Sequence, residues 1–178
     1  MNIRQQLLVA HSRSNADLVL NYVLADQRRL PQLLEVFLHE EYQIVQRAAM
    51  VVGDLGRVEP YWLQPYHGAL LAAADTPGRD AVKRNVMRYF SEFPLEAVAE
   101  PDRGNLLDLA FRLLESPTEA VAIRVFAMQV VANFCPEFPE LKDELAGIIE
   151  LTLAEGTTPG FVSRGRKILQ ALRSVKES

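Results

Sequence analysis

The sequence contains few of the features that define a secreted or membrane protein. Its single cysteine, Cys135, excludes an internal disulfide bond and suits a reducing compartment. No apolar run approaches the roughly 20 residues that a membrane-spanning helix needs. The apolar run near the N-terminus, 7–10, is too short for the core of a signal peptide. The sequence therefore predicts a cytoplasmic protein without a membrane partner.

Acidic residues slightly outnumber basic residues. The 19 Lys and Arg residues stand against 23 Asp and Glu, which gives a formal net charge of −4. A net charge of this size gives no reason to expect non-specific attraction to nucleic acid or to a membrane surface. The length of 178 residues suits one domain with a substantial core. We therefore expect a single globular domain over residues 1–178.

Clusters of residues that carry catalysis or bind metals are missing from the sequence pattern. His11, His39 and His67 are 28 residues apart each time, whereas metal ligands normally come in closely spaced pairs. Cys135 precedes Pro136 at the end of an apolar segment, and no base is indicated beside it, so we expect a packed thiol. The sequence therefore predicts no catalytic residue, no metal and no cofactor, and a protein that is not an enzyme.

No segment alternates polar and apolar residues as a strand would, and the apolar positions instead follow helical spacing. Prolines near expected helix starts and glycines near expected ends divide the chain into short helices. Pro60 is expected to open a helix that Pro65 kinks. The sequence thus predicts an all-α fold. An N-terminal cap is expected over 1–29, and four helix pairs over about 30–57, 59–93, 102–135 and 139–175.

Four arginines recur in step with these helix pairs. Each lies two residues after a small apolar residue, and the gaps between them are 37, 40 and 40 residues. Self-similarity at this period is typical of repeat arrays, in which each pair buries its apolar face by stacking on its neighbours. The four are Arg47, Arg84, Arg124 and Arg164.

The segment from Val45 to Gly56, which reads Val-Gln-Arg-Ala-Ala-Met-Val-Val-Gly-Asp-Leu-Gly, resembles the second helix of a HEAT-type or armadillo-like repeat. The resemblance covers about residues 30–175 and implies an α-α superhelix, a curved solenoid of stacked helix hairpins. The whole chain is also similar to an uncharacterised bacterial family of HEAT-like proteins, some labelled adenylosuccinate lyase. The serine-rich catalytic loop of that lyase has no counterpart here, so the residues do not support the label.

Charge separates between the two helices of each pair. The second helices, expected over 42–57, 79–93, 118–135 and 161–175, hold eleven Lys or Arg and four acids, a net of +7. The first helices, expected over 30–41, 59–75, 102–116 and 139–155, hold thirteen acids and three bases, a net of −10. The resemblance implies that second helices line the concave side of the solenoid. The sequence therefore predicts a basic concave groove for an acidic protein or peptide, and an interaction scaffold as the function.

The bases divide into two groups by position. The repeated Arg47, Arg84, Arg124 and Arg164 are interpreted, by the same resemblance, as a structural ladder that pairs with acids and carbonyls of neighbouring repeats. The bases outside this register are the candidates for partner contact: Lys83, Arg88, Arg166, Lys167 and Arg173.

Nucleic acid is the alternative partner, because HEAT-like DNA alkylation-repair proteins also carry a basic concave face. The groove bases here are few, and the only tryptophan, Trp62, falls on an expected first helix. These observations favour the acidic protein or peptide.

Overall fold

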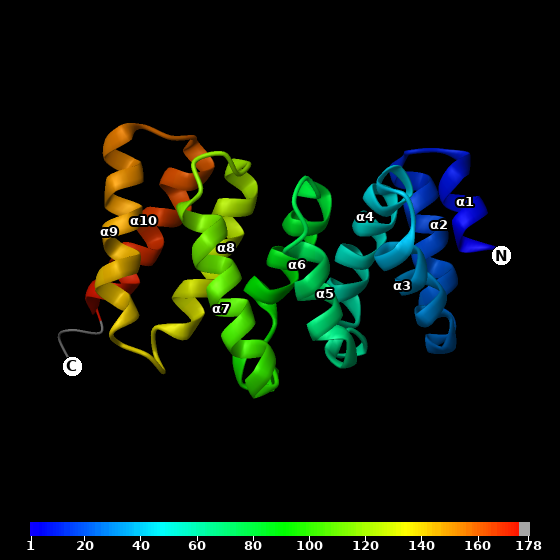
Figure 1. Cartoon of the computed structure of the whole chain (residues 1–178), viewed down its shortest axis with the longest axis horizontal. Coiled ribbons are helices and arrows are strands. Elements are labelled where there is room, and N and C mark those ends of the chain that lie inside the picture. Colours follow the sequence, from blue (N-terminus) through cyan, green and yellow to red (C-terminus); the bar gives the residue numbers. More distant parts are fainter. Residues whose placement is uncertain (175–178) are drawn as a thin grey trace. The chain divides into compact units, whose positions relative to one another are not determined.

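The computed structural model describes residues 1–174, and every regular element in this range is helical (Figure 1). The all-α prediction is confirmed, and four helix pairs follow two N-terminal helices. No helix in the described range is long and apolar enough to cross a membrane. The chain divides between Tyr89 and Phe90 into two compact units, which we call the N-terminal unit and the C-terminal unit. The single superhelix over residues 1–178 stays a prediction.

The N-terminal unit contains α1 and α2, then the pair α3–α4, and then α5 with most of α6, whose last turn belongs to the C-terminal unit. Helices α1 to α4 pack on one another. The bounds are α1 Ile3–Val9, α2 Arg13–Leu24, η1 Gln27–Arg29, α3 Leu30–His39, α4 Tyr42–Val58, η2 Pro60–Trp62, η3 Gln64–Tyr66, α5 His67–Ala74 and α6 Asp80–Glu92.

The segment between α4 and α5 corrects one expectation. The sequence predicted one helix opened by Pro60 and kinked at Pro65, but two short 3₁₀ helices, η2 and η3, occupy this segment. Pro60 is the first residue of η2 and Pro65 is the second residue of η3, and at both positions the missing N–H leaves no hydrogen bond unmade. The α-helix begins only at His67, one residue after the second turn.

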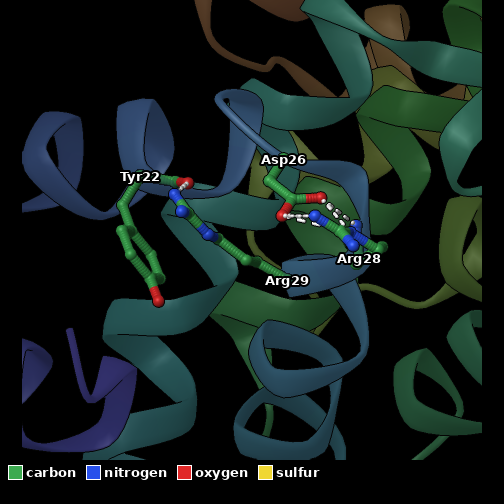
Figure 2. A network of polar contacts seen from close by, with 4 residues as sticks. All are labelled: Tyr22, Asp26, Arg28 and Arg29. Carbon is green, nitrogen blue, oxygen red and sulfur yellow. Dashed lines mark hydrogen bonds and ion pairs between the residues drawn. The ribbon is translucent and has the colours of Figure 1, made fainter.

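The turn between α2 and α3 is held by two arginines (Figure 2). Arg28 donates through its backbone N–H and its guanidinium to the Asp26 carboxylate, and these hydrogen bonds hold the pKa of Asp26 below its usual range. Arg29 donates to the Tyr22 carbonyl at 2.7 Å and lies over the Tyr22 ring, 4.1 Å from its centre. The first contact lies within the turn, and the second joins the turn back to Tyr22 of α2.

Helices α4 and α6 approach closely. A Cβ built on Gly56 of α4 would meet the Tyr89 ring of α6 at 2.7 Å, so only glycine fits this position without a shift. The Tyr89 hydroxyl donates to the Pro60 carbonyl at 2.9 Å, and His67 Nε2 lies 2.8 Å from the same hydroxyl. Because that hydroxyl has only one proton, His67 Nε2 is the donor to it. Tyr89 thereby links α4, α5 and α6.

The C-terminal unit contains η4, α7, α8, α9 and α10 (Figure 1). Helix α7 packs on α8, and α8, α9 and α10 pack on one another. Its largest fully buried side chains include Leu106, Leu114, Ile123, Met128 and Phe161. The bounds are η4 Leu95–Ala97, α7 Glu100–Glu115, α8 Val121–Phe134, α9 Leu141–Glu155 and α10 Pro159–Ser174. Val175, the expected end of the last repeat, lies outside the described residues.

Candidate binding pocket

Two of the repeated arginines contact carbonyl groups at the ends of other helices. Arg47 Nη1 donates to the Leu7 carbonyl at 2.7 Å and to the Leu8 carbonyl at 3.3 Å, in the last turn of α1. Arg124 Nε donates to the Leu114 carbonyl at 2.8 Å, in the last turn of α7. The last carbonyls of a helix lack intrahelical partners, so these cations satisfy otherwise open acceptors.

Arg124 also joins two further helices of the C-terminal unit. Its Nη2 donates to the Thr152 hydroxyl of α9 at 3.2 Å, and its guanidinium lies 5.3 Å from the centre of the Phe161 ring of α10. The side chain is half-buried. One arginine of α8 therefore contacts α7, α9 and α10, as a structural residue would.

The other two repeated arginines are exposed. Arg84 lies on the surface of α6, and Arg164 lies on the surface of α10, where its Nη1 donates to Gln129 Oε1 at 2.8 Å. Arginines at the same position of the repeat therefore lie in two different environments: two contact helix carbonyls, and two are exposed. The ladder role of Arg84 and Arg164 stays a prediction.

The five candidates for partner contact differ in their exposure to solvent. Lys83 is buried with 8% of its surface exposed, contrary to the expected surface position, because α6 buries a wide arc that includes this residue. Arg88 of α6 is half-buried. Arg166, Lys167 and Arg173 are exposed on α10, and Arg173 forms an ion pair with Glu150 of α9 at 3.1 Å. Three of the five are thus exposed, all on α10.

A pocket of about 570 Å³ lies in the C-terminal unit between α8, α10 and the start of α9. Three cations line it, and no Asp or Glu does. The other lining residues are mainly apolar. The full set is Gln129, Ala132, Cys135, Pro136, Pro139, Lys142, Arg164, Lys167, Ile168, Ala171 and Leu172.

The packing of α10 explains which residues reach the pocket. A Cβ on Gly165 would meet Ile149 Cγ2 of α9 at 2.9 Å, so the glycine face of α10 lies directly against α9. Arg164, Lys167 and Ala171 follow one another at intervals of three and four residues and therefore share another face of α10. That face borders the pocket. Gly165 thus sets the orientation of the two α10 cations.

A chain of hydrogen bonds orients Arg164. Gln129 Oε1 accepts from Arg164, and Gln129 Nε2 donates to Asn133 Oδ1 at 2.9 Å, one turn further along α8. Asn133 Nδ2 in turn donates to the Ser91 carbonyl at 3.1 Å. Because Nη1 is held by Gln129, the guanidinium lies at the pocket with a restricted orientation and with further N–H donors.

Cys135 lines the pocket as a buried thiol. Its Sγ donates to the Val131 carbonyl at 3.6 Å. Burial raises the pKa of the thiol, and the nearby Lys142 partly opposes this effect. The thiol therefore stays protonated at neutral pH and is a poor nucleophile. Among residues 1–174, no three His, Cys, Asp or Glu side chains gather as metal ligands would.

Sequence reasoning missed part of this pocket. Lys142 was counted with the acidic first helices, and Gln129 was not singled out. Pro136 and Pro139 were the available signal, because they interrupt the chain between α8 and α9 and place Lys142 in the first turn of α9. The contribution of α9 to a site on α8 and α10 depends on this turn.

Comparison with known proteins supports the repeat architecture. The profile of a family described as HEAT repeat domain matches residues 3–172, which is almost the whole chain. No curated protein and no solved structure matches the chain. HEAT repeats form helical scaffolds that often mediate protein interactions. The helix pairs, the recurring arginines and this match agree, and the chain belongs to the HEAT repeat family.

Proposed function

We propose that this protein is a non-enzymatic interaction scaffold that binds an acidic protein or peptide segment at the pocket of the C-terminal unit. The observation that carries the proposal is the lining of this pocket, in which Lys142, Arg164 and Lys167 occur with no carboxylate. Within residues 1–174, none of these three cations forms an ion pair. An anionic partner would supply the missing counter-charges.

Helix α10 extends the positive surface beyond the pocket. It contains Arg164, Arg166 and Lys167, together with Arg173, which is paired with Glu150 of α9, and it has no acidic residue. Clustered charge of one sign raises the local concentration of an oppositely charged partner, even when the net charge of the protein is negative. The exposed face of α10 therefore supports an acidic partner where the net charge of −4 does not.

Two finer parts of the proposal rest on the sequence. Arg88 belongs to the α6 bases, and its share in one continuous groove with α10 stays a prediction. A cytoplasmic location, inferred from the single cysteine, stays a prediction as well.

Nucleic acid is the second candidate, and the four bases of α10 favour it. Phosphate groups would bind these cations without using the apolar lining of the pocket. A peptide uses both the cations and the apolar lining, so the acidic segment accounts for more of the pocket.

A selection from a random library tests the proposal. The protein is immobilised, and phage-displayed random peptides of twelve residues are selected at physiological salt and sequenced. We expect the selected peptides to be enriched in Asp and Glu relative to the starting library. A selection without this enrichment, or with enrichment in Lys and Arg, would overturn the proposal.

A parallel measurement tests the second candidate. Binding of a fluorescein-labelled duplex DNA of 20 base pairs is followed by anisotropy across a salt series. We expect no saturable binding at physiological salt. Tight binding with a steep dependence on salt would favour nucleic acid and overturn the preference for a protein partner.

A further inference from the structure

We infer that the acidic segment is recognised through one large apolar side chain that enters the pocket, flanked by carboxylates that bind Arg164, Lys167 and Lys142. This inference rests on the proposed function and names the partner's local chemistry. The partner must therefore carry a large apolar side chain as well as negative charge.

The interior of the pocket explains the need for an apolar side chain. Ala132 of α8 and Ile168, Ala171 and Leu172 of α10 line it, and none of these can pair with a charge. A purely anionic ligand would lose hydration against this lining and gain nothing from it. The volume of about 570 Å³ falls within the range of roughly 300–1,000 Å³ typical of ligand-binding clefts and cavities. The pocket can therefore accommodate a large side chain.

The cations of the pocket explain the need for flanking carboxylates. Arg164 and Lys167 lie about one turn apart on α10, and Lys142 comes from α9, so the pocket draws its charges from two helices. A segment that places its apolar side chain in the pocket has its neighbouring residues close to these cations. Arg164 is also held by Gln129, so less side-chain freedom is lost on binding.

A single buried anchor surrounded by charged contacts is a common way for a small interface to gain affinity. Truncation of a central anchor typically weakens binding by about tenfold or more, whereas solvent-exposed charges around it contribute less. Cations that border an apolar pocket are partly desolvated by a bound anchor, which strengthens their attraction to carboxylates. The pocket therefore combines an apolar contact with charge selectivity.

A steric variant and its neighbour form the first test. Ala171→Phe places an aromatic side chain at the pocket lining and keeps all three cations, whereas Gln170→Phe adds the same group at an exposed position outside the pocket. The probe is a fluorescein-labelled decapeptide with one central leucine between two pairs of glutamates. We expect Ala171→Phe to weaken binding about tenfold and Gln170→Phe to change it less than twofold.

Two charge reversals form the second test. Lys167→Glu changes a cation of the pocket, and Arg166→Glu changes its exposed neighbour, which does not line the pocket. The net charge changes equally in both variants. We expect Lys167→Glu to weaken the decapeptide at least tenfold and Arg166→Glu to weaken it about twofold. Unchanged melting temperatures would show that all four variants are folded.

Changes in the probe separate the two proposals. Replacing its leucine by alanine should weaken binding about tenfold, and replacing its glutamates by glutamine should weaken it at least as much. Equal binding of the leucine and alanine probes, or equal losses in Lys167→Glu and Arg166→Glu, would overturn the anchored mode and leave an acidic partner in place. Failure of both acidic probes to bind, together with a selection that is not enriched in acids, would overturn the proposed function itself.

Discussion

The second helices of neighbouring repeats pack differently in the two units. In the N-terminal unit, α4 meets α6 through Gly56, and the Tyr89 ring occupies the space that a side chain would need. In the C-terminal unit, α8 and α10 also pack on each other, yet a pocket of about 570 Å³ remains between them and α9. One helix pairing gives an interior contact and the other a candidate site. Repeated helix pairs therefore pack differently in the two units.

The arginines at one repeat position show the same contrast within a single unit. Arg124 is half-buried and contacts Leu114, Thr152 and Phe161 from three other helices. Arg164, one repeat later, is exposed, and among the residues that the structure describes its side chain hydrogen-bonds only to Gln129. The first has the surroundings of a structural residue, and the second those of a residue available to a partner.

The largest effect is expected where the helices are closest. Gly56→Val would force a branched side chain against the Tyr89 ring, which its hydrogen bonds hold in place. We expect the free energy of unfolding to fall by about 3 kcal/mol, because overpacking a closed contact requires the helices to move apart. Urea denaturation followed by circular dichroism measures this change.

Gly147 of α9 provides the matched control. A Cβ at this position would meet nothing within 4 Å, and the residue lies inside a helix. Gly147→Val should therefore change stability by less than about 0.5 kcal/mol, because valine and glycine differ little in helix propensity. Equal destabilisation by the two changes would contradict the close contact of α4 with α6.

The next largest change in stability is expected at Arg124, in contrast to Arg164. Arg124→Ala removes hydrogen bonds to a carbonyl and to a hydroxyl, and we expect a loss of about 2 kcal/mol. Arg164→Ala should change stability by no more than about 0.5 kcal/mol, because its side chain is exposed. Equilibrium urea unfolding of both variants checks this, and similar losses in the two would refute the distinction.

Tyr89→Phe tests the polar contact that accompanies the close approach in the N-terminal unit. The change leaves the His67 Nε2 donor and the Pro60 carbonyl without this hydroxyl. We expect a loss of about 1–2 kcal/mol in the free energy of unfolding. Tyr66→Phe is the control, since the structure gives its hydroxyl no hydrogen bond, and it should change stability by less than about 0.5 kcal/mol. A loss in the control as large as that in Tyr89→Phe would argue against the linking role of Tyr89.

The smallest effect concerns alkaline pH. Burial, with a smaller contribution from Tyr61, raises the pKa of Tyr89 above its ordinary value of 10.0. Above that pH the unfolded chain releases this proton and the folded chain keeps it, so the unfolded state binds fewer protons and stability falls as pH rises. The slope from this one group is at most about 1.4 kcal/mol per pH unit. Between pH 9.5 and 10.5, Tyr89→Phe should lose stability less steeply than the natural protein. Parallel slopes would contradict the shift.

Local patterns in the sequence were sufficient to predict the helical class and most helix positions. Periodic apolar residues and the placement of proline and glycine act within a few residues of where they occur. The prediction failed at Pro65, because a kinked helix and two 3₁₀ turns are both compatible with prolines five residues apart. Leu63, fully buried between the two turns, is held by tertiary packing.

The candidate site was only partly predictable. Lys167, Arg166 and Arg173 were singled out by their positions on α10, and all three are exposed there. Lys83 was predicted to be exposed on the same grounds, but it is buried. Charge and register cannot separate these cases, because the width of the buried arc on α6 depends on the helices that surround it.

The sequence by itself determined that the chain is a series of helix pairs, that arginine recurs in the second helix of each pair, and that the bases concentrate on those helices. These properties follow from residue type and spacing along a helix. Only the tertiary structure decided that Arg124 is half-buried among three other helices while Arg164 borders a pocket, and that Lys142 lines this pocket with Arg164 and Lys167. The reason is distance along the chain: Arg164 meets Gln129 from 35 residues away, and Arg124 meets Thr152 from 28. Such contacts depend on how the helices stack, which no local pattern in the sequence records.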